Sequence, residues 1–579
     1  MLAAGISPRG GSHPRGPAHP PTAEQAAAVD AFLTGARLKV SAFAGAGKTS
    51  TLVQMAQARA GSGLYLAFNR SIADEARASF PASVDCRTTH SVALRAVRAS
   101  GGYGKDKRFG AIKAKQFAGQ LEKTVIVGDV MTLSDVQQAH LLLGTVKRFC
   151  QSADDVIGGE HVPEVGRLLA LPSAMRGVVE DWIVRRAAHL WGRMRDPDHA
   201  IPLGHDGYLK LWSLGSPVLE HDYILLDEAQ DTNPCVLRVL ERQSGQVVYV
   251  GDRHQQIYAW RGAVNAMSEA RAEHEAFLTQ SFRFGPAIAE AASAVLCTLG
   301  ETRALVGNPR ITSTIAGSGP ADAVLARTNA TVISEVLGAL EAQRRPHIVG
   351  GSDEMVRLVS SVFDLQDGRP ASHPDFFGFA NWDQVEAFAD TEEGEALRPF
   401  VSLVRKHGPR QLWRALKETV ADEKGADVVI STAHKAKGRQ WPSVGIADDF
   451  AGVQTETGAI PAEEARLFYV AITRAQERLV VAPALLAGFG RGRMEPKTDD
   501  GRISQTSPAA GSSPAPLVLS RLSNGLEPEA VLVADEPGRG AGPSASLSPR
   551  SAAPQGGAIP PQAPSGQQRR GLLARLFGR

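Results

Sequence analysis

Short runs of consecutive hydrophobic residues recur along the chain, and stretches with helical spacing of apolar residues lie between them. Hydrophobic runs without polar alternation are typical of strands that are buried on both faces of a parallel sheet. In the first half we expect strands at residues 38–43, 64–68, 223–226 and 247–250. In the second half we expect strands at residues 323–326, 428–430, 444–446 and 479–481. The alternation predicts an α/β protein with parallel sheets covered by helices.

Two mostly helical stretches, 94–220 and 351–425, interrupt this pattern and are interpreted as insertions. The first α/β unit then comprises residues 21–93 and 221–276, and the second comprises 277–350 and 426–489. Residues 1–20 and 490–579 are rich in Pro, Gly and Ser, so we expect a disordered lead and a disordered tail. The tail ends in a short basic amphipathic element.

Composition and charge exclude only a few classes of protein. The 579 residues include 63 basic and 61 acidic side chains, a net charge of +2, so a nucleic-acid surface has to be a local stripe of charge. The four cysteines are too widely spaced to favour a zinc site or a disulfide framework. No run approaches the roughly 18 apolar residues of a membrane span, and we expect a cytoplasmic protein.

The segment from Ala42 to Thr49 lies between an expected strand and an expected helix, which is the context of a phosphate-binding P-loop. Its small residues allow backbone N–H groups to approach a phosphate, Lys48 supplies a charge, and the Thr49 hydroxyl can reach Mg²⁺. A chance Gly-Lys-Thr is the alternative, and Ala42 stands where such loops usually begin with Gly.

An acidic strand end supplies the other half of such a pocket. Asp227 and Glu228 directly follow the hydrophobic run 223–226. Asp227 can hold Mg²⁺, and Glu228 can orient and deprotonate a water for in-line attack. A solvated acidic loop is the alternative, but a buried strand makes it the weaker one. Together the two motifs predict an NTPase that uses Mg²⁺.

Residues 250–263 follow another hydrophobic run and combine polar and aromatic side chains. Gln255 is placed to sense a phosphate, whereas Tyr258, Trp260 and Arg261 suit single-stranded nucleic acid, because any base offers a stacking face. Core aromatics at a strand end are the alternative interpretation of this segment.

These segments occur in the order found in the UvrD/Rep-like branch of superfamily 1 DNA helicases, and the chain resembles most closely the helicase core of F-box DNA helicases, without an F-box. The matching segments are a glutamine motif at 22–25, motif I at 42–50, motif Ia at 67–76, motif Ib at 88–91, motif II at 227–231, motif III at 250–263, motif IV at 280–284, a segment at 326–329, motif V at 431–438 and motif VI at 464–475. Residues 205–212 strengthen the F-box helicase likeness. The resemblance implies two RecA-like P-loop domains, each with a mostly helical insertion.

The resemblance also assigns roles to individual residues. The residues expected at the nucleotide are Gln25, Ala44, Gly45, Ala46, Gly47, Lys48, Thr49, Ser50, Phe282 and Gln440. Those expected to take part in hydrolysis are Lys48, Asp227, Glu228, Gln255, Arg283 and Arg474, with Thr49 and Asp227 at the metal. Those expected along the DNA strand are Phe68, Asn69, Thr89, His90, Tyr258, Trp260, Arg261 and His434. A core position is an equal alternative for Phe68.

Two departures from the family pattern qualify the resemblance. Gln440 stands where the family usually has a glutamate that contacts the nucleotide sugar, so we expect altered nucleotide affinity rather than loss of activity. The second insertion is also short, which puts its usual regulatory role in doubt.

The resemblance implies an ATP-dependent helicase or translocase that acts on single-stranded DNA and at single-strand/double-strand junctions. Movement from 3′ to 5′ and a role in DNA repair or recombination control are expected. An anti-recombinase that strips a recombinase filament from DNA is the main alternative, while a helicase–nuclease subunit and an inactive scaffold are weaker ones. The C-terminal stretch from Leu572 to Phe577 is a weak candidate for docking to a sliding clamp.

Overall fold

The computed structural model describes residues 20–489, apart from residues 101–102, 104–108, 111, 170, 259–264, 393 and 452–459. Three predictions therefore lie outside the described residues: Trp260 and Arg261 on the strand path, disorder of the terminal segments, and docking through residues 572–577. The described residues all belong to one compact unit of the chain.

The first sheet has six parallel strands in the order β3-β2-β6-β7-β1-β8. The strands are β1 (Leu38–Ala42), β2 (Gly63–Ala67), β3 (Val84–Thr88), β6 (Tyr223–Leu226), β7 (Gln246–Gly251) and β8 (His274–Leu278). Alternate residues of β6 enter two different cores, since Ile224 packs on one face of the sheet and Leu225 on the other. Burial on both faces explains the unbroken hydrophobic runs in these strands.

The first sheet extends further along the chain than the sequence suggested. The second unit was expected to begin at Phe277, but β8 pairs with β1 and places Phe277 and Leu278 in the first sheet. β8 lies at the edge, and its polar residues His274 and Glu275 are only partly buried or exposed. Those polar residues hide the strand from a search for hydrophobic runs.

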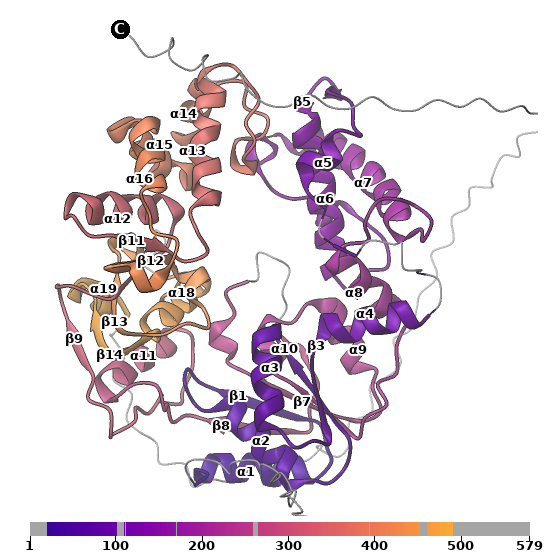
Figure 1. Cartoon of the computed structure of the whole chain (residues 1–579), viewed down its shortest axis with the longest axis vertical. Helices are drawn as coiled ribbons and strands as arrows, with labels where there is room; N and C mark the ends of the chain where they lie inside the picture. Colours follow the sequence, from indigo (N-terminus) through magenta and orange to yellow (C-terminus); the bar gives the residue numbers. More distant parts are fainter. Residues whose placement is uncertain are drawn as a thin grey trace, which may run out of the picture. The chain divides into compact units, whose positions relative to one another are not determined.

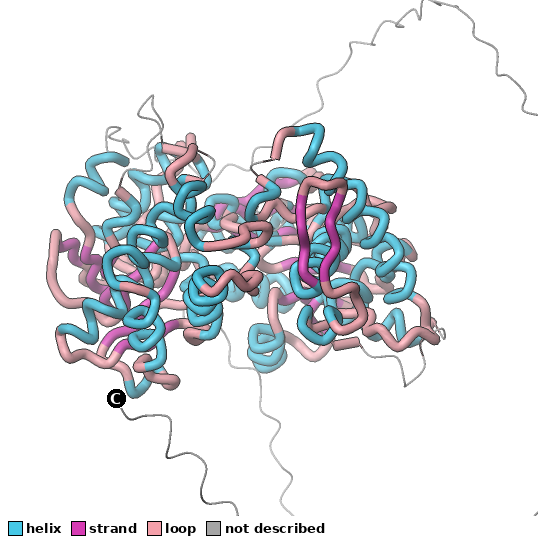
Figure 2. The backbone as a smooth tube through the Cα atoms, turned by 90° about the horizontal axis from the view of Figure 1, so that it is seen from above, coloured by secondary structure: helices cyan, strands magenta, loops and turns pink. Residues whose placement is uncertain are grey.

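The second sheet also has six parallel strands, in the order β11-β12-β10-β13-β14-β9. The strands are β9 (Thr314–Ala316), β10 (Ala323–Ala326), β11 (Pro346–Ile348), β12 (Val428–Thr432), β13 (Trp441–Ile446) and β14 (Ala475–Val480). Figure 2 shows the strands of the sheets enclosed by helices. The predicted α/β class, with two parallel sheets, is confirmed.

Helices surround both sheets. Those before the second sheet are α1 (Ala23–Leu33), α2 (Lys48–Ala58), α3 (Arg70–Ser79), α4 (Thr89–Ala99), α5 (Ala114–Ala118), α6 (Asp135–Gln151), α7 (Ser173–Arg195), α8 (His205–Leu214), α9 (Pro234–Glu241) and α10 (Ala266–Glu269). Those that follow are α11 (Pro286–Thr298), α12 (Asn329–Glu341), α13 (Asp353–Gln366), α14 (Trp382–Ala389), α15 (Arg398–His407), α16 (Pro409–Lys417), α17 (Ala433–Ala436), α18 (Ala462–Ile472) and α19 (Pro483–Phe489). Figure 1 shows α12 to α16 grouped beside β11 and β12.

The two insertions touch each other. The first contains a short antiparallel hairpin, β4 (Thr124–Val127) and β5 (Met131–Ser134), that the sequence did not reveal. The backbone N–H of Arg167 donates to the carbonyl of Phe377 in the second insertion at 2.9 Å. Gly166 has a φ of +52° and lies so close to the Phe377 backbone that a side chain would collide with it. The ring of His140 lies 5.5 Å from that of Phe377.

The cysteines and the helices complete the description of the fold. All four cysteines are free, and Cys86, Cys150 and Cys235 are buried. Among the described residues no helix is both long enough and apolar enough to cross a membrane.

Candidate nucleotide and nucleic-acid site

The loop between β1 and α2 has the backbone of a phosphate cradle. Gly45 and Gly47 have φ values of +74° and +78°, in the left-handed region that favours glycine. A Cβ atom on Gly45 would lie 2.5 Å from Oγ of Ser281 and 2.7 Å from Cβ of Arg283. Lys48 begins α2, followed by Thr49 and Ser50, so the loop residues 44–47 lead directly into a helix N-terminus.

Gln25 and Phe282, both expected at the nucleotide, meet at Gly47. A Cβ atom on Gly47 would lie 3.1 Å from Nε2 of Gln25 and 3.2 Å from the ring of Phe282. Gln25 is buried and donates to the hydroxyl of Thr51 at 3.1 Å, whereas Phe282 is 40% exposed. The structure therefore brings together an amide, an open aromatic face and the P-loop, three groups that suit a purine base.

Asp227 and Glu228 follow β6 at its carboxyl end. Asp227 accepts from the hydroxyl of Tyr65 at 2.8 Å and from the backbone N–H of Glu228 at 2.9 Å. Lys48 forms an ion pair with Glu228, with 3.1 Å between Nζ and Oε1. The P-loop lysine and the two carboxylates are thus assembled in one place, as the sequence predicted.

Burial and neighbouring charges shift the pKa values of Asp227, Glu228 and Lys48. Burial and the neighbouring Glu228 raise the pKa of Asp227. Burial would also raise the pKa of Glu228, but Lys48 and then Lys437 outweigh it and lower that pKa. For Lys48, burial lowers the pKa, but the charges of Glu228 and Asp227 outweigh it and the net shift is upward. Lys48 and Glu228 are therefore both charged, and each neutralises the other.

A buried relay connects the P-loop with α18. The backbone N–H of Ala44 donates to the hydroxyl of Tyr469 at 3.1 Å, and this hydroxyl donates to Asp252 at 3.0 Å. The same Asp252 oxygen accepts from Nε2 of Gln255 at 2.8 Å. Oε1 of Gln255 accepts from Arg474 at 3.4 Å. One hydrogen-bond network therefore joins motifs I and III, in the unit of the first sheet, to motif VI, in the unit of the second sheet.

The two arginines expected to take part in hydrolysis converge on Thr473. Arg283 donates to the Thr473 carbonyl at 2.9 Å and, through Nε, to Oε1 of Gln440 at 3.0 Å. Arg474 is 1% exposed and donates to the Thr473 hydroxyl at 3.0 Å. Burial, and then the charge of Arg283, lower the pKa of Arg474 to about 9. Gln440 thus contacts an arginine, a partner that the sequence did not indicate.

Two ion pairs strengthen the same contact between the units. Lys437 pairs with Asp231 and also donates to the backbone carbonyl of Gln255 at 2.5 Å. Glu301, which follows α11, accepts from Arg253 at 2.5 Å and lies 3.1 Å from Nε2 of His254. Both pairs join motif II or III of the first unit to the second.

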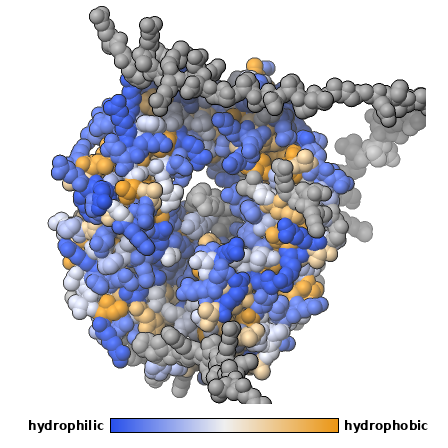
Figure 3. Space-filling view, viewed as in Figure 1, coloured by the Kyte–Doolittle hydropathy of each residue, from blue (hydrophilic) through white to orange (hydrophobic). Residues whose placement is uncertain are grey.

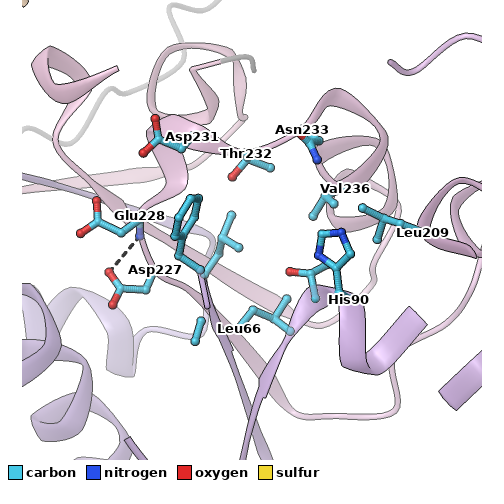
Figure 4. A pocket seen from close by; sticks show the side chains of 13 residues that line it. Leu66, His90, Leu209, Asp227, Glu228, Asp231, Thr232, Asn233 and Val236 are labelled. Atoms are coloured by element: carbon cyan, nitrogen blue, oxygen red, sulfur yellow. Dashed lines mark hydrogen bonds between the residues drawn. The ribbon is translucent and has the colours of Figure 1, made fainter. Parts of the chain in front are cut away.

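A pocket on the first unit joins predicted strand-binding residues to the carboxylates. Phe68, Thr89 and His90 line it together with Asp227 and Glu228. Figure 4 shows the two carboxylates on one side and His90 on the other. Phe68 is 54% exposed, which disfavours the core alternative for it.

Three other strand candidates have defined local roles. Asn69 caps α3 by accepting from the backbone N–H of Ile72 at 2.9 Å. Tyr258 donates to the carbonyl of His434 at 3.0 Å, and their rings are 6.3 Å apart. Tyr258 and His434, from motifs III and V, are therefore brought together, and Lys437 lies 5.4 Å from the Tyr258 ring.

Several connecting residues were missed by reasoning from the sequence. They are Tyr65, Gln230, Asp252, Lys437 and Tyr469. Four of them lie inside segments already recognised as motifs, but a linear motif does not show which way a side chain points. Tyr65 is in the run 64–68, where it is indistinguishable from a core residue.

The residues present fit Mg²⁺. The hydroxyl of Thr49 and the carboxylate of Asp227 are the hard oxygen ligands that Mg²⁺ prefers. The Tyr65 hydroxyl and the Glu228 N–H both donate to Asp227, and hydrogen bonds of this kind would orient the carboxylate towards a metal ion.

The fold and the site define a P-loop NTPase with two RecA-like units. The family model described as "UvrD/REP helicase N-terminal domain" matches residues 219–274, and the one described as "UvrD-like helicase C-terminal domain" matches residues 382–484. Both matches are to UvrD-like helicase domains, one in each unit, which confirms the resemblance drawn from the motifs.

Curated relatives agree with this placement. The chain is 32% identical over 499 residues to "F-box DNA helicase 1" of Gallus gallus, covering 78% of this chain and 48% of the relative. It is 29% identical over 507 residues to "F-box DNA helicase protein 1" of Schizosaccharomyces pombe, covering 79% and 57%. The chain thus spans about half the length of these relatives. A solved structure titled "The structure of PRRSV helicase" aligns with a TM-score of 0.27 at 13% identity, over 79% of this chain and 54% of that one.

Proposed function

We propose that this chain is an ATP-dependent motor that moves on single-stranded DNA and unwinds duplex at a junction. The observation that carries the proposal is the buried relay from Ala44 through Tyr469 and Asp252 to Gln255 and Arg474. A motor needs the phosphate site on one unit to be sensed by the other, and this relay supplies that connection. Motif III, which contains Gln255, continues to Tyr258 beside the predicted strand path.

The proposed chemistry is in-line attack of water on the γ-phosphate. In the structure Lys48 holds Glu228, so Glu228 is a poor base while the pair persists. Bound ATP competes for Lys48 through its phosphates, which frees Glu228 to accept a proton from the attacking water. Arg283 and Arg474 then stabilise the charge that develops on the phosphoryl oxygens. Mg²⁺, held by Thr49 and Asp227, supplies charge neutralisation at the phosphates when it is bound.

The proposed coupling uses both predicted strand-binding groups. Phe68, Thr89 and His90 would hold bases on the first unit, and Tyr258 with His434 would hold them between motifs III and V. We further propose 3′ to 5′ movement and a role in DNA repair or recombination control, with filament removal as the alternative outcome. A strand-displacement assay beside a filament-disruption assay separates unwinding from stripping.

ATPase measurements with single-stranded DNA, duplex DNA and RNA in parallel test the proposal. Single-stranded DNA should give the largest stimulation. Glu228→Gln should lower the stimulated rate about a hundredfold or more, because it removes the general base. Glu220→Gln, at an exposed position, is the charge-matched control and should keep the wild-type rate. Full stimulated ATPase in Glu228→Gln would overturn the mechanism.

A further inference from the structure

One face of α16 gathers cations around an exposed tryptophan. Arg410, Trp413, Arg414 and Lys417 are spaced i, i+3, i+4 and i+7, which places them along a single side of the helix. Trp413 is 38% exposed, and Nζ of Lys417 lies 5.6 Å from its ring. On the opposite side of α16, the apolar residues are buried in the core of the second insertion.

These cations have no acidic partners. In the part of the chain that the structure describes, none of Arg410, Arg414 and Lys417 forms an ion pair. By contrast, Arg405 on the neighbouring α15 pairs with Glu386 at 2.8 Å. The chain as a whole is nearly neutral at +2, so three unpaired cations on one helix face form the kind of local stripe that a polyanion requires.

Helix stability explains only part of this arrangement. Arg414 and Lys417 lie in the last turn of α16, where cations interact favourably with the helix dipole. Arg410 lies in the first turn, where a cation is unfavourable, and that turn has no acidic residue. Trp413 packs against the protein over part of its surface but leaves 38% of it open to solvent. The first-turn arginine and the open indole therefore need another explanation.

We propose that this face of α16 is a second binding surface for single-stranded DNA. Arg410, Arg414 and Lys417 contact phosphates, and Trp413 stacks on an unpaired base. Single strand is favoured over duplex because the bases of a duplex are already stacked on one another and offer no face to an indole. Figure 3 shows that one face of the whole molecule is mostly hydrophilic, with scattered hydrophobic residues. The inference rests on the proposed function, since it concerns the same nucleic acid.

The test is equilibrium binding of the full chain to labelled oligo(dT) across a salt series, followed by fluorescence anisotropy. The variant R410A/R414A/K417A should reduce the slope of log affinity against log salt by about 2, since each phosphate contact on a single strand contributes about 0.7. The control R185A/R271A/R310A removes the same charge from scattered exposed positions and should leave the slope unchanged. Trp413→Ala should weaken binding about tenfold, and Trp413→Phe should restore most of the loss.

Three results would contradict the α16 surface, the single-strand assignment or the proposed function. Equal slopes for the two triple variants, with wild-type binding intact, would overturn the α16 surface alone. Loss of duplex binding with unchanged oligo(dT) binding would overturn the single-strand assignment. Absence of oligo(dT) binding by the wild-type chain would instead overturn the proposed function. Basal ATPase should remain at the wild-type rate in all these variants, which confirms that they fold.

Discussion

Glu228 combines an unusual backbone with opposed electrostatic contacts. Its φ of +51° lies in the left-handed region, which costs a non-glycine residue about 1 kcal/mol or more. Lys48 binds one carboxylate oxygen and Gln230 the other. Such strain persists only where the surroundings fix it, so the fold aims this carboxylate at the P-loop lysine. The sequence predicted the residue, but its backbone conformation depends on contacts that a motif does not contain.

Gln255 is the residue at which the relay is easiest to interrupt. Gln255→Ala should lower both basal and DNA-stimulated ATPase about tenfold, because Arg474 loses one of its acceptors and Asp252 loses a donor. Steady-state ATPase with and without single-stranded DNA measures both rates. Gln120→Ala, at an exposed amide, serves as the control. A wild-type basal rate in Gln255→Ala would show that the relay is not needed for hydrolysis.

At the scale of elements, the sequence predicted the central strands well and the peripheral ones poorly. Strands buried on both faces, such as β6 and β7, have continuous hydrophobic runs and were placed within a residue or two. The edge strands β8 and β9 have exposed polar or isolated apolar residues, so they carry no such run. The hairpin of β4 and β5 was missed although β4 is a β-branched run, because the run is only four residues long and lies within a mostly helical stretch.

The P-loop shows how one element depends on another. Gly45→Ala should weaken ATP binding at least tenfold, because the new Cβ would meet Ser281 and Arg283 as well as strain a φ of +74°. Binding of a fluorescent ATP analogue measures the effect. Gly35→Ala is a matched control, since Gly35 has a φ of +82° but nothing within 4 Å of the added atom. Equal losses in the two variants would mean that backbone strain alone is responsible.

At the scale of the whole molecule, the important contacts join residues that are 157 to 425 positions apart. Ala44 meets Tyr469, Asp231 meets Lys437, and Arg283 meets Gln440. The motifs could be recognised in order from the sequence because each is local. Their partnerships depend on how the two sheets' units pack, and residue spacing along the chain does not encode that packing.

The stabilisation that Glu301 gives to the contact between the units should depend on pH. Although burial would raise its pKa, His254 and Arg253 lower it to about 2. Because the folded-state pKa lies below the unfolded value of about 4.3, the stabilisation is present above that value and is lost as pH falls towards 2. Glu301→Gln should therefore lower the free energy of unfolding by about 2 kcal/mol at neutral pH, and the difference from wild type should shrink in acid.

Denaturant unfolding at a series of pH values measures this difference. Glu392→Gln, at an exposed position, is the control and should show no such trend. A constant difference between Glu301→Gln and wild type from neutral pH down to about 3 would contradict the ion-pair explanation.

The hydrogen bond between Arg167 and Phe377 gives the chain a mechanical property. The first unit holds its insertion, that insertion touches the second insertion, the second insertion packs on the second unit, and the second unit returns to the first through Tyr469. These four contacts form a closed ring, so the angle at one of them cannot change independently of the others. Any opening at the P-loop must therefore be accompanied by bending or loss of another contact in the ring. The Arg167–Phe377 contact, made by a few residues, is the one that would yield first.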